Sequence, residues 1–297
     1  MGATYVPPDA TSKPFPHGDG GRAEPISNLR AMPVVALNGI NLSYQVQGEG
    51  DLVVMVMGTG SPGRVWHAHQ VPALREAGFR VATVDNRGIP PTDECAAGMK
   101  IDDLVGDVAA LIESLGGRAH VVGTSMGARV TQELALARPD LVAKAVMLAT
   151  AGRNDPVQSA LSHGERALHD QGITLPPRYF AAVDAVLNLS PATLRDPVVA
   201  RDWLDVFEFT GSAVGKGVRA QMDLNDFDDR LDAYRAITVP CLVVGFADDR
   251  VLPAHLAREV AEAIPGARYE EVADAGHFGF LEQPAAVNRL LVDFLTG

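Results

Sequence analysis

The sequence predicts an α/β fold, with a mostly parallel sheet, helices on both of its faces and one helical insertion. Strand-like and helix-like segments alternate along residues 33–150 and again along 237–297. Such alternation is typical of parallel strands joined by crossover helices. Several strand segments are continuous apolar runs, as expected of strands buried on both faces. Residues 151–236 show helical patterns and turns without a clear buried strand, which predicts a separate helical region.

Composition and charge narrow the class of protein. Of the 297 residues, 47% are hydrophobic and 21% are charged, as in ordinary globular proteins. The net charge is −12, and an acidic chain without a basic cluster repels phosphate backbones, so we expect no nucleic-acid partner. No apolar run approaches the roughly 20 residues that span a bilayer, and the N-terminus lacks the apolar stretch of a signal peptide. We therefore expect a cytoplasmic protein without a membrane partner.

The elements up to residue 150 follow in order. Residues 1–32 are rich in Pro, Gly and charged residues without periodicity, which predicts an extended N-terminal arm. Asn38-Gly39 is a strong turn dipeptide and predicts a hairpin. The predicted elements are strands 33–37, 40–47 and 51–57, helix 66–77, strand 79–85, helix 101–116, strand 118–123, helix 128–140 and strand 144–150.

The alternation returns after the helical region. The predicted elements there are strand 238–246, helix 254–264, strand 267–272 and helix 284–296. We therefore assign 33–150 and 237–297 to one α/β core, with 151–236 inserted after its sixth strand.

A serine motif follows the fifth predicted strand. Gly123-Thr124-Ser125-Met126-Gly127 is a G-x-S-x-G pentapeptide that ends an apolar strand and opens an amphipathic helix. A nucleophile elbow requires this setting, because its tight turn exposes the serine hydroxyl. The flanking glycines avoid clashes between strand and helix, and the helix N-terminus offers positive potential to a developing oxyanion. The motif predicts Ser125 as a nucleophile rather than a helix-capping serine.

A serine nucleophile needs a base and an acid that orients the base. His277 lies in the loop after the last predicted strand, within reach of a nucleophile on a neighbouring strand. Asp248 and Asp249 directly follow the preceding strand, so the chain order is Ser, Asp, His. Only one aspartate can hold the imidazole. We favour Asp249 and leave Asp248 open.

With these loops, the chain resembles the α/β-hydrolase superfamily over residues 33–297, most of the insert excepted. The elbow GTSMG, the acid loop FADDRVLP and the histidine loop DAGHFGFLEQP match the superfamily in order and spacing. Its acid loop often reads G-x-x-D-x-x-x-P, and this chain has one residue more. Counting forward from Gly245 therefore gives Asp248, and counting back from Pro253 gives Asp249. The resemblance implies an eight-stranded sheet and makes 151–236 a helical cap.

The resemblance extends to two further loops. Residues 57–63 take the place of the family's His-Gly oxyanion loop, with Met57 for the usual histidine. This implies that the backbone N–H of Thr59 joins that of Met126 in an oxyanion hole. Asp85 and Arg87 resemble the D-x-R-G-x-G segment, and we expect them to fix the loop beneath the site. The residues that we assign to substrate binding are Gly58, Trp203, Phe207 and Phe278.

These residues predict two-step hydrolysis of an ester, lactone or thioester. His277 takes the proton of Ser125, the serine attacks the carbonyl, and water then releases the acyl group. We expect no cofactor and no metal, because Cys95 and Cys241 are too few for a zinc site and the histidines form no ligand pattern. The predicted partner is a small-molecule substrate, and secondary metabolism is compatible with the composition. The sequence does not indicate an oligomeric state.

Other activities on this scaffold stay open. Relatives that open epoxides or displace halides use an aspartate at the elbow, so Ser125 excludes them. A lyase, a cyclase or a cofactor-free haloperoxidase is compatible with the same three residues. Ser125 to Arg129, SMGAR, loosely resembles the S-M-G-G-R stretch of an eliminating synthase of the menaquinone pathway. For Arg129 we favour a helix-surface salt bridge, with a substrate carboxylate as the alternative partner. A binding protein is the remaining alternative, and the complete set of three residues argues against it.

Overall fold

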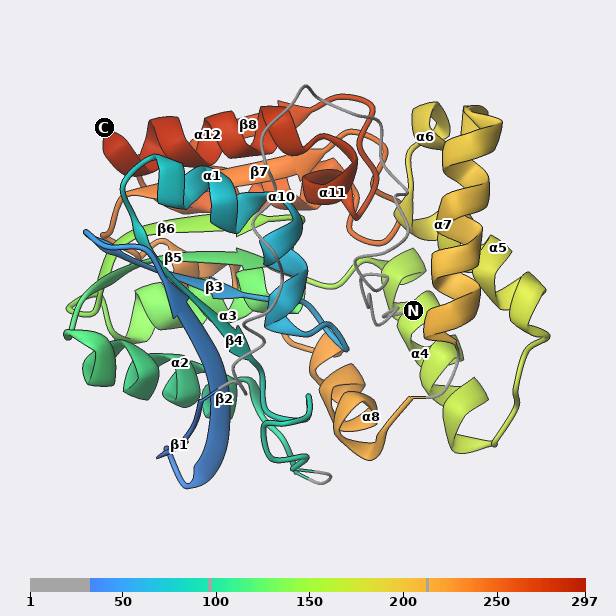
Figure 1. The fold of residues 1–297 in the computed structure, drawn as a ribbon, viewed down its shortest axis with the longest axis horizontal. Coiled ribbons are helices and arrows are strands. Elements are labelled where there is room, and N and C mark those ends of the chain that lie inside the picture. The colour runs from blue at the N-terminus through green and yellow to red at the C-terminus, as the bar shows by residue number, and fades with distance from the viewer. Residues whose placement is uncertain (1–32, 96–97, 212–213) are drawn as a thin grey trace, which may run out of the picture.

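The computed structural model describes residues 33–95, 98–211 and 214–297. The predicted arm, residues 1–32, lies outside this part of the chain. Eight described strands form one sheet in the order β1-β2-β4-β3-β5-β6-β7-β8 (Figure 1). The pairs β1–β2 and β2–β4 are antiparallel, and the other neighbouring pairs are parallel. The predicted class, a mostly parallel α/β sheet of eight strands, is confirmed.

The strands are β1 Val34–Leu37, β2 Ile40–Gln47, β3 Leu52–Val56, β4 Arg80–Asp85, β5 Ala119–Thr124, β6 Val142–Leu148, β7 Cys241–Phe246 and β8 Arg268–Val272. The helices around the sheet are η1 Gly63–Ala68, α1 Gln70–Glu76, α2 Ile101–Leu115, α3 Met126–Ala137, α10 Ala254–Ala263, α11 Gly279–Glu282 and α12 Pro284–Thr296. The helices between β6 and β7 are α4 Pro156–Asp170, α5 Pro177–Asn188, α6 Pro191–Arg195, α7 Pro197–Thr210, α8 Lys216–Met222, η2 Asp223–Asn225 and α9 Leu231–Tyr234.

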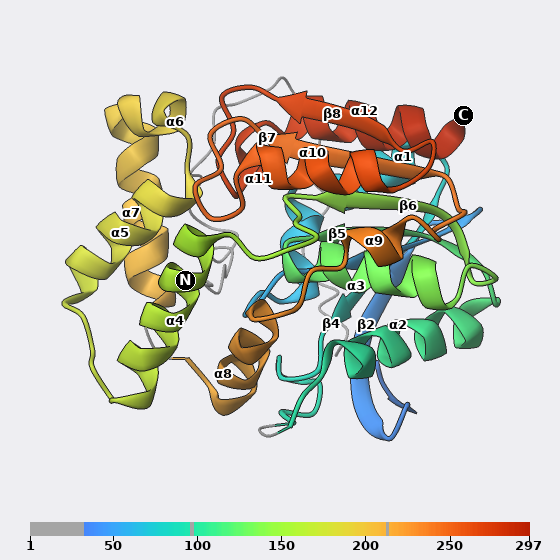
Figure 2. The ribbon, with the colours of Figure 1, turned by 180° about the vertical axis from the view of Figure 1, so that it is seen from behind.

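The sheet is the centre of a three-layer core. Every residue of β3, β5 and β7 is buried, as the continuous apolar runs predict. One apolar cluster joins a face of the sheet to α2, α3 and α10, and a second joins the other face to η1, α1, α11 and α12. Figure 2 shows α2, α3 and α10 in front of the sheet, on the opposite side from α1. The hairpin at Asn38-Gly39 has positive φ at both residues, +47° and +77°, as a type I′ turn requires.

Three predicted elements differ from the structure by about three residues at one end, and local chain geometry explains two of these differences. The helix expected over 66–77 is divided at His69 into η1 and α1, and we have no physical account of the break. The helix expected over 128–140 ends at Ala137, because Pro139 keeps the residue before it out of the helical region. The strand expected over 238–246 begins at Cys241, because Pro240 lacks an N–H for a sheet ladder.

Four helices of the segment between β6 and β7, α4 to α7, form a group at one side of the sheet. Figure 1 shows α4 to α7 beyond the end of β6, apart from the helices that cover the sheet. Local caps start these helices: the Asp155 carboxylate accepts the Val157 N–H at 2.8 Å before α4, and Asp196 accepts the Val198 N–H at 2.9 Å before α7. A proline follows each of these caps at the first helical position, where its fixed φ suits the helix. Among the described residues, no helix is long and apolar enough to cross a membrane.

Candidate active site

Ser125 occupies a strained turn between β5 and α3. Its φ is +55° and its ψ is −122°, a conformation that costs a non-glycine residue about 1–3 kcal/mol. A Cβ on Gly123 would lie 2.1 Å from the carbonyl oxygen of Gly127, and one on Gly127 would lie 2.2 Å from that of Val56. Strand and helix therefore approach closely only because both positions are glycine. The turn presents the serine side chain at the carboxyl ends of the parallel strands.

A chain of two hydrogen bonds joins Ser125, His277 and Asp249. His277 Nε2 lies 3.1 Å from Ser125 Oγ, and His277 Nδ1 lies 2.8 Å from Asp249 Oδ2. A carboxylate only accepts, so Nδ1 carries the proton toward Asp249, and Nε2 of the neutral ring is left to accept from the serine hydroxyl. His277 is 7% exposed and Asp249 is 5% exposed. Little water therefore competes for these hydrogen bonds.

Asp249, rather than Asp248, is the aspartate in contact with His277. The other oxygen of Asp249, Oδ1, accepts the backbone N–H groups of Val251 and Leu252, each at 2.8 Å. These bonds fix the carboxylate in the loop after β7 and leave Oδ2 for the imidazole. Asp248 takes part through its backbone, since its N–H donates to the carbonyl of Ala275 at 2.9 Å. Counting back from the proline therefore finds the aspartate that contacts the histidine.

The loop after β3 passes directly over Ser125. A Cβ built on Gly58 would lie 3.1 Å from the Cβ of Ser125, so the backbone of this loop comes as near to the serine as a glycine permits. Thr59 of this loop lines a cavity together with Ser125, and Met126 follows the serine as the first residue of α3. Within the described residues, neither the Thr59 nor the Met126 backbone N–H donates to a protein acceptor. The backbone donors that the sequence assigns to an oxyanion hole are therefore not used by other described groups.

Gln221 of α8 holds this loop in place, and sequence reasoning missed it. Its side chain is fully buried. Oε1 accepts the Gly60 N–H at 2.8 Å, and Nε2 donates to the Arg87 carbonyl, also at 2.8 Å. Asn86 adds a bond from Nδ2 to the Met57 carbonyl at 2.9 Å. The glutamine is about 160 residues from the loop that it supports, and it belongs to no motif that could have marked it.

Asp85 and Arg87 support the same region from below. Asp85 Oδ1 accepts the Gly63 N–H at 2.8 Å. Burial raises the pKa of Asp85, and that hydrogen bond opposes the rise. Arg87 pairs with Asp107 of α2 through two contacts of 2.6 Å. Both side chains thus bind protein groups, in keeping with the structural role expected of them.

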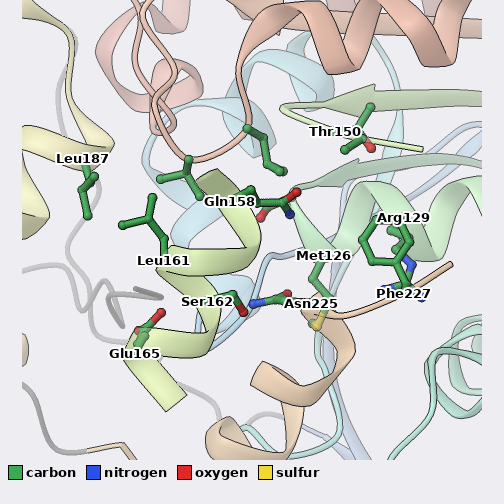
Figure 3. A pocket seen from close by; sticks show the side chains of 14 residues that line it. Met126, Arg129, Thr150, Gln158, Leu161, Ser162, Glu165, Leu187, Asn225 and Phe227 are labelled. Atoms are coloured by element: carbon green, nitrogen blue, oxygen red, sulfur yellow. The ribbon is translucent and has the colours of Figure 1, made fainter. Parts of the chain in front are cut away.

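Two cavities meet at Ser125. We call them the Phe278 cavity, of about 610 Å³, and the Arg129 cavity, of about 710 Å³, and both volumes include the open solvent at the cavity mouth. Ser125, Asn225 and Val251 line both. The other residues of the Phe278 cavity are Met57, Gly58, Thr59, Ser61, Val65, Thr124, Asn188, His277, Phe278, Phe280 and Leu281. The other residues of the Arg129 cavity are Met126, Arg129, Thr150, Ala151, Gln158, Leu161, Ser162, Glu165, Leu187, Phe227 and Leu252, and Figure 3 shows their side chains.

The predicted substrate-binding residues fall into two groups. Gly58 and Phe278 line the Phe278 cavity. Trp203 and Phe207 of α7 line neither of the two cavities. They stack on each other at 5.6 Å between ring centroids and contact Phe278 at 6.2 and 6.1 Å. The structure therefore places these two rings behind Phe278, where they fix its position.

The helices after β6 complete the site from the side. The Asn188 carbonyl at the end of α5 accepts the Phe278 N–H at 3.0 Å, and Arg250 in the acid loop donates to the Val186 and Leu189 carbonyls at 2.8 and 3.0 Å. A Cβ on Gly276 would lie 2.5 Å from the Asn188 carbonyl oxygen. The loops that carry His277 and Asp249 therefore pack directly against the end of α5. In the part of the chain that the structure describes, no group of three or more His, Cys, Asp or Glu residues could hold a metal ion.

A strand–serine–helix turn, a buried histidine–aspartate pair and an eight-stranded sheet in this order define an α/β hydrolase. The family model described as "Alpha/beta hydrolase family" matches residues 53–290. The chain belongs to this family, and the resemblance drawn from its loops is confirmed.

Individual relatives span most of the chain. A Mycobacterium tuberculosis (strain ATCC 25618 / H37Rv) protein provisionally named non-heme bromoperoxidase BpoC is 47% identical over 86% of this chain and 98% of its own length. The crystal structure of BpoC superposes with a TM-score of 0.83 at 46% identity, over 86% of this chain and 96% of that one. The enol-lactonase from Burkholderia xenovorans LB400 superposes with a TM-score of 0.77 at 29% identity, over 89% of this chain and 100% of that one. A Variovorax paradoxus (strain S110) protein provisionally named carbamate hydrolase RutD is 28% identical over 86% of this chain and 96% of its own length. These names are consistent with an α/β-fold enzyme, and hydrolases are prominent among them.

Proposed function

We propose that the protein is a serine hydrolase that cleaves an ester, lactone or thioester of a small organic substrate through an acyl-enzyme. The observation that carries this proposal is the pair of hydrogen bonds that aligns Ser125, His277 and Asp249 where two cavities meet. A carbonyl carbon at Ser125 Oγ has room for one substituent in each cavity. The enol-lactonase among the similar structures supports the same class of reaction.

The proposed reaction has two steps. His277 Nε2 takes the hydroxyl proton as Ser125 Oγ attacks the carbonyl carbon. The oxyanion that forms accepts hydrogen bonds from the backbone N–H groups of Thr59 and Met126. His277 then gives its proton to the leaving oxygen or sulfur. In the second step water attacks the acyl-enzyme, His277 takes a proton from that water, and the acid leaves as the proton returns to Ser125. Asp249 holds the ring and stabilises the imidazolium in both steps.

The helices between β6 and β7 are proposed as a cap over this site. Leu161 and Ser162 of α4 line the Arg129 cavity, and Asn188 at the end of α5 lines the Phe278 cavity. A cap built in this way excludes water from the reacting groups and selects substrates by shape. We place the boundaries of the cap at residues 151 and 236.

The test is active-site labelling with a fluorophosphonate, followed by mass spectrometry of the modified peptide and by hydrolysis of p-nitrophenyl acetate, butyrate and octanoate. We expect one adduct, on Ser125, and turnover of at least one ester. Ser125→Ala should fold normally, with its unfolding midpoint in urea near that of the wild type, and should lose both adduct and turnover. Wild-type turnover in that variant would reject the proposal. Ser114→Ala is a matched control, because Ser114 Oγ donates only to the Leu111 carbonyl, within its own helix.

A second candidate is bromide oxidation, which the name of the mycobacterial relatives favours. The same acyl-enzyme, attacked by hydrogen peroxide in place of water, releases a peroxy acid. The peroxy acid oxidises bromide to hypobromous acid and is reduced to the carboxylic acid. Bromination of monochlorodimedone in acetate, peroxide and bromide distinguishes the candidates. A rate that matches ester hydrolysis supports this activity, and a rate no higher than that of Ser125→Ala excludes it.

A further inference from the structure

Unpartnered polar atoms gather on the wall of the Arg129 cavity. Thr150 Oγ1, Ser162 Oγ and Arg129 Nε are buried atoms without a hydrogen-bond partner among the described residues, and all three side chains line this cavity. Thr150 is fully buried and Ser162 is 9% exposed. Buried polar groups in folded proteins are nearly always hydrogen-bonded, so three such groups around one cavity need an explanation. All three residues can donate a hydrogen bond.

The charge of Arg129 has no anion of its own. Among the described residues no carboxylate lies within ion-pair distance of its guanidinium. Glu133, one turn further along α3, uses both of its oxygens on Arg230, each at 2.9 Å. Burial accordingly lowers the pKa of Arg129, with Tyr234 and Glu133 opposing the shift. An arginine nevertheless stays protonated in proteins, so a positive charge faces the cavity one helical turn after Ser125. The helix-surface salt bridge that the sequence favoured for Arg129 is therefore not found among the described residues.

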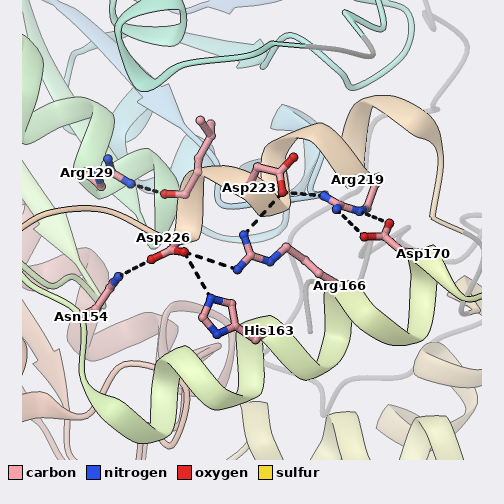
Figure 4. Close-up of polar contacts among 9 residues, drawn as sticks. Arg129, Asn154, His163, Arg166, Asp170, Arg219, Asp223 and Asp226 are labelled. Atoms are coloured by element: carbon pink, nitrogen blue, oxygen red, sulfur yellow. Dashed lines mark hydrogen bonds and ion pairs between the residues drawn. The ribbon is translucent and has the colours of Figure 1, made fainter.

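Arg129 is held in place by uncharged groups. Nη1 donates to the Leu224 carbonyl, as Figure 4 shows, and the Phe227 ring lies 3.8 Å from the guanidinium carbon. The residues around this contact are tied to α4 by ion pairs, since Asp223 and Asp226 bind Arg166 at 3.4 and 3.7 Å (Figure 4). The guanidinium is therefore fixed before any ligand arrives. A preorganised group of this kind binds with little loss of side-chain entropy.

We infer that the Arg129 cavity binds a carboxylate of the substrate, with Arg129 as its counter-ion and the hydroxyls of Thr150 and Ser162 as further donors. The inference rests on the proposed function, because it names the class of substrate that Ser125 attacks: a small ester, lactone or thioester with a carboxylate on one side of the reacting carbonyl. A neutral ligand could accept hydrogen bonds from these donors, but only an anion also neutralises the charge. Glu165 is the one acidic residue among those that line this cavity. Figure 3 shows it on the side of the cavity away from Arg129. The mainly apolar Phe278 cavity takes the other half of the substrate.

The experiment compares each acid with its neutral amide. One pair carries the charge on the acyl side: mono-p-nitrophenyl glutarate and p-nitrophenyl glutaramate. The other carries it on the alcohol side: the butyrate esters of 3-hydroxybenzoate and 3-hydroxybenzamide. In one of the pairs we expect the wild type to favour the acid in kcat/KM. Arg129→Met should lower that ratio of acid to amide about 10- to 100-fold, the range of a charge-assisted hydrogen bond. Thr150→Val should lower it about 2- to 10-fold, as expected for a neutral donor.

The ratio separates binding from a structural role. If Arg129 only anchors Leu224 and Phe227, Arg129→Met lowers kcat/KM for both members of a pair alike, the ratio stays constant, and the inference fails. It also fails if the wild type favours the amide in both pairs. Arg153→Met is the matched control, because Glu259 already neutralises Arg153 through contacts of 2.7 and 2.6 Å; its ratio should equal that of the wild type.

A binding measurement covers the case in which no ester is hydrolysed. That result would reject the proposed function and leave the carboxylate site to be judged by calorimetric titration of the wild type with glutarate and glutaramate. Binding of glutarate alone, weakened at least tenfold in Arg129→Met, supports the site. Equal binding of the two compounds, or no binding of glutarate, overturns it.

Discussion

Gln221 gives the sharpest test of how the structure positions the groups around Ser125. The change is Gln221→Met, which keeps the length and the approximate volume of the side chain and removes both of its hydrogen bonds. The Gly60 N–H and the Arg87 carbonyl then lose partners that now lie at 2.8 Å. Because Gln221 is fully buried, water does not readily replace it.

The magnitude follows from these two groups. Leaving one buried polar group unpaired costs about 1–3 kcal/mol, so two cost about 2–6 kcal/mol. If the loop keeps its place, this cost lowers the free energy of unfolding, which for most proteins is about 5–15 kcal/mol. If the loop moves to satisfy the Gly60 N–H, the neighbouring Thr59 N–H moves with it. In the proposed mechanism the loss of that donor lowers kcat by about 10²–10³. We expect the second outcome, because a glycine-rich loop deforms more readily than a buried strand.

The assay measures three quantities: kcat and KM for p-nitrophenyl butyrate, the rate of fluorophosphonate labelling, and the free energy of unfolding in urea. We expect kcat and the labelling rate to fall together by 10-fold or more, with KM within about threefold of the wild type, because the lost interaction belongs to the transition state. Gln132→Met is the matched control. Gln132 is also fully buried, and its contact is with the Tyr234 hydroxyl at 3.4 Å, away from the loop. A Gln221→Met protein that loses stability but keeps the wild-type kcat would refute the reasoning, because the glutamine would then support only the fold.

Two further predictions concern aspartates. Asp249→Asn should lower kcat by about 10⁴, because an amide no longer favours the His277 tautomer with its proton on Nδ1. The control Asp248→Asn should keep kcat within about threefold of the wild type. Equal losses of kcat in the two variants would contradict the assignment of Asp249. Asp184 is fully buried on α5, neither of its carboxylate oxygens has a partner among the described residues, and burial raises its pKa. The carboxyl therefore binds a proton more tightly in the folded chain, so its contribution to stability is lost as pH rises above about 4, the unfolded value. Asp184→Asn should become more stable relative to the wild type as pH rises from 4 toward 8 in urea unfolding, and a difference that does not change with pH would show that the carboxyl is not protonated in the folded state.

The sequence by itself determined the fold class and two of the three residues aligned at the elbow, Ser125 and His277, and it favoured Asp249 as the third. Apolar runs long enough for buried strands, separated by helical periods, are compatible with few architectures besides a parallel α/β sheet. The G-x-S-x-G turn is local, because the strain at Ser125 and the two glycines beside it lie within five residues. His277 and Asp249 could be found because each follows a strand, and parallel strands deliver their carboxyl ends to one edge of the sheet. Helix and strand ends were less certain, because prolines and tertiary packing move them by a few residues.

Only the tertiary structure decided what surrounds these groups. Gln221 reaches the loop after β3 from α8, and no local pattern encodes a contact between segments so far apart. Trp203 and Phe207 are aromatic residues of the kind that line binding sites, yet they pack behind Phe278. The sequence could not distinguish these positions, because hydrophobic periodicity predicts that a side chain is buried but not which residues it contacts. Arg129 sits one turn after the serine in sequence. Its lack of an anion depends on Arg230 taking both oxygens of Glu133. Local order follows from local sequence, whereas pairing, burial and cavities depend on which distant segments meet.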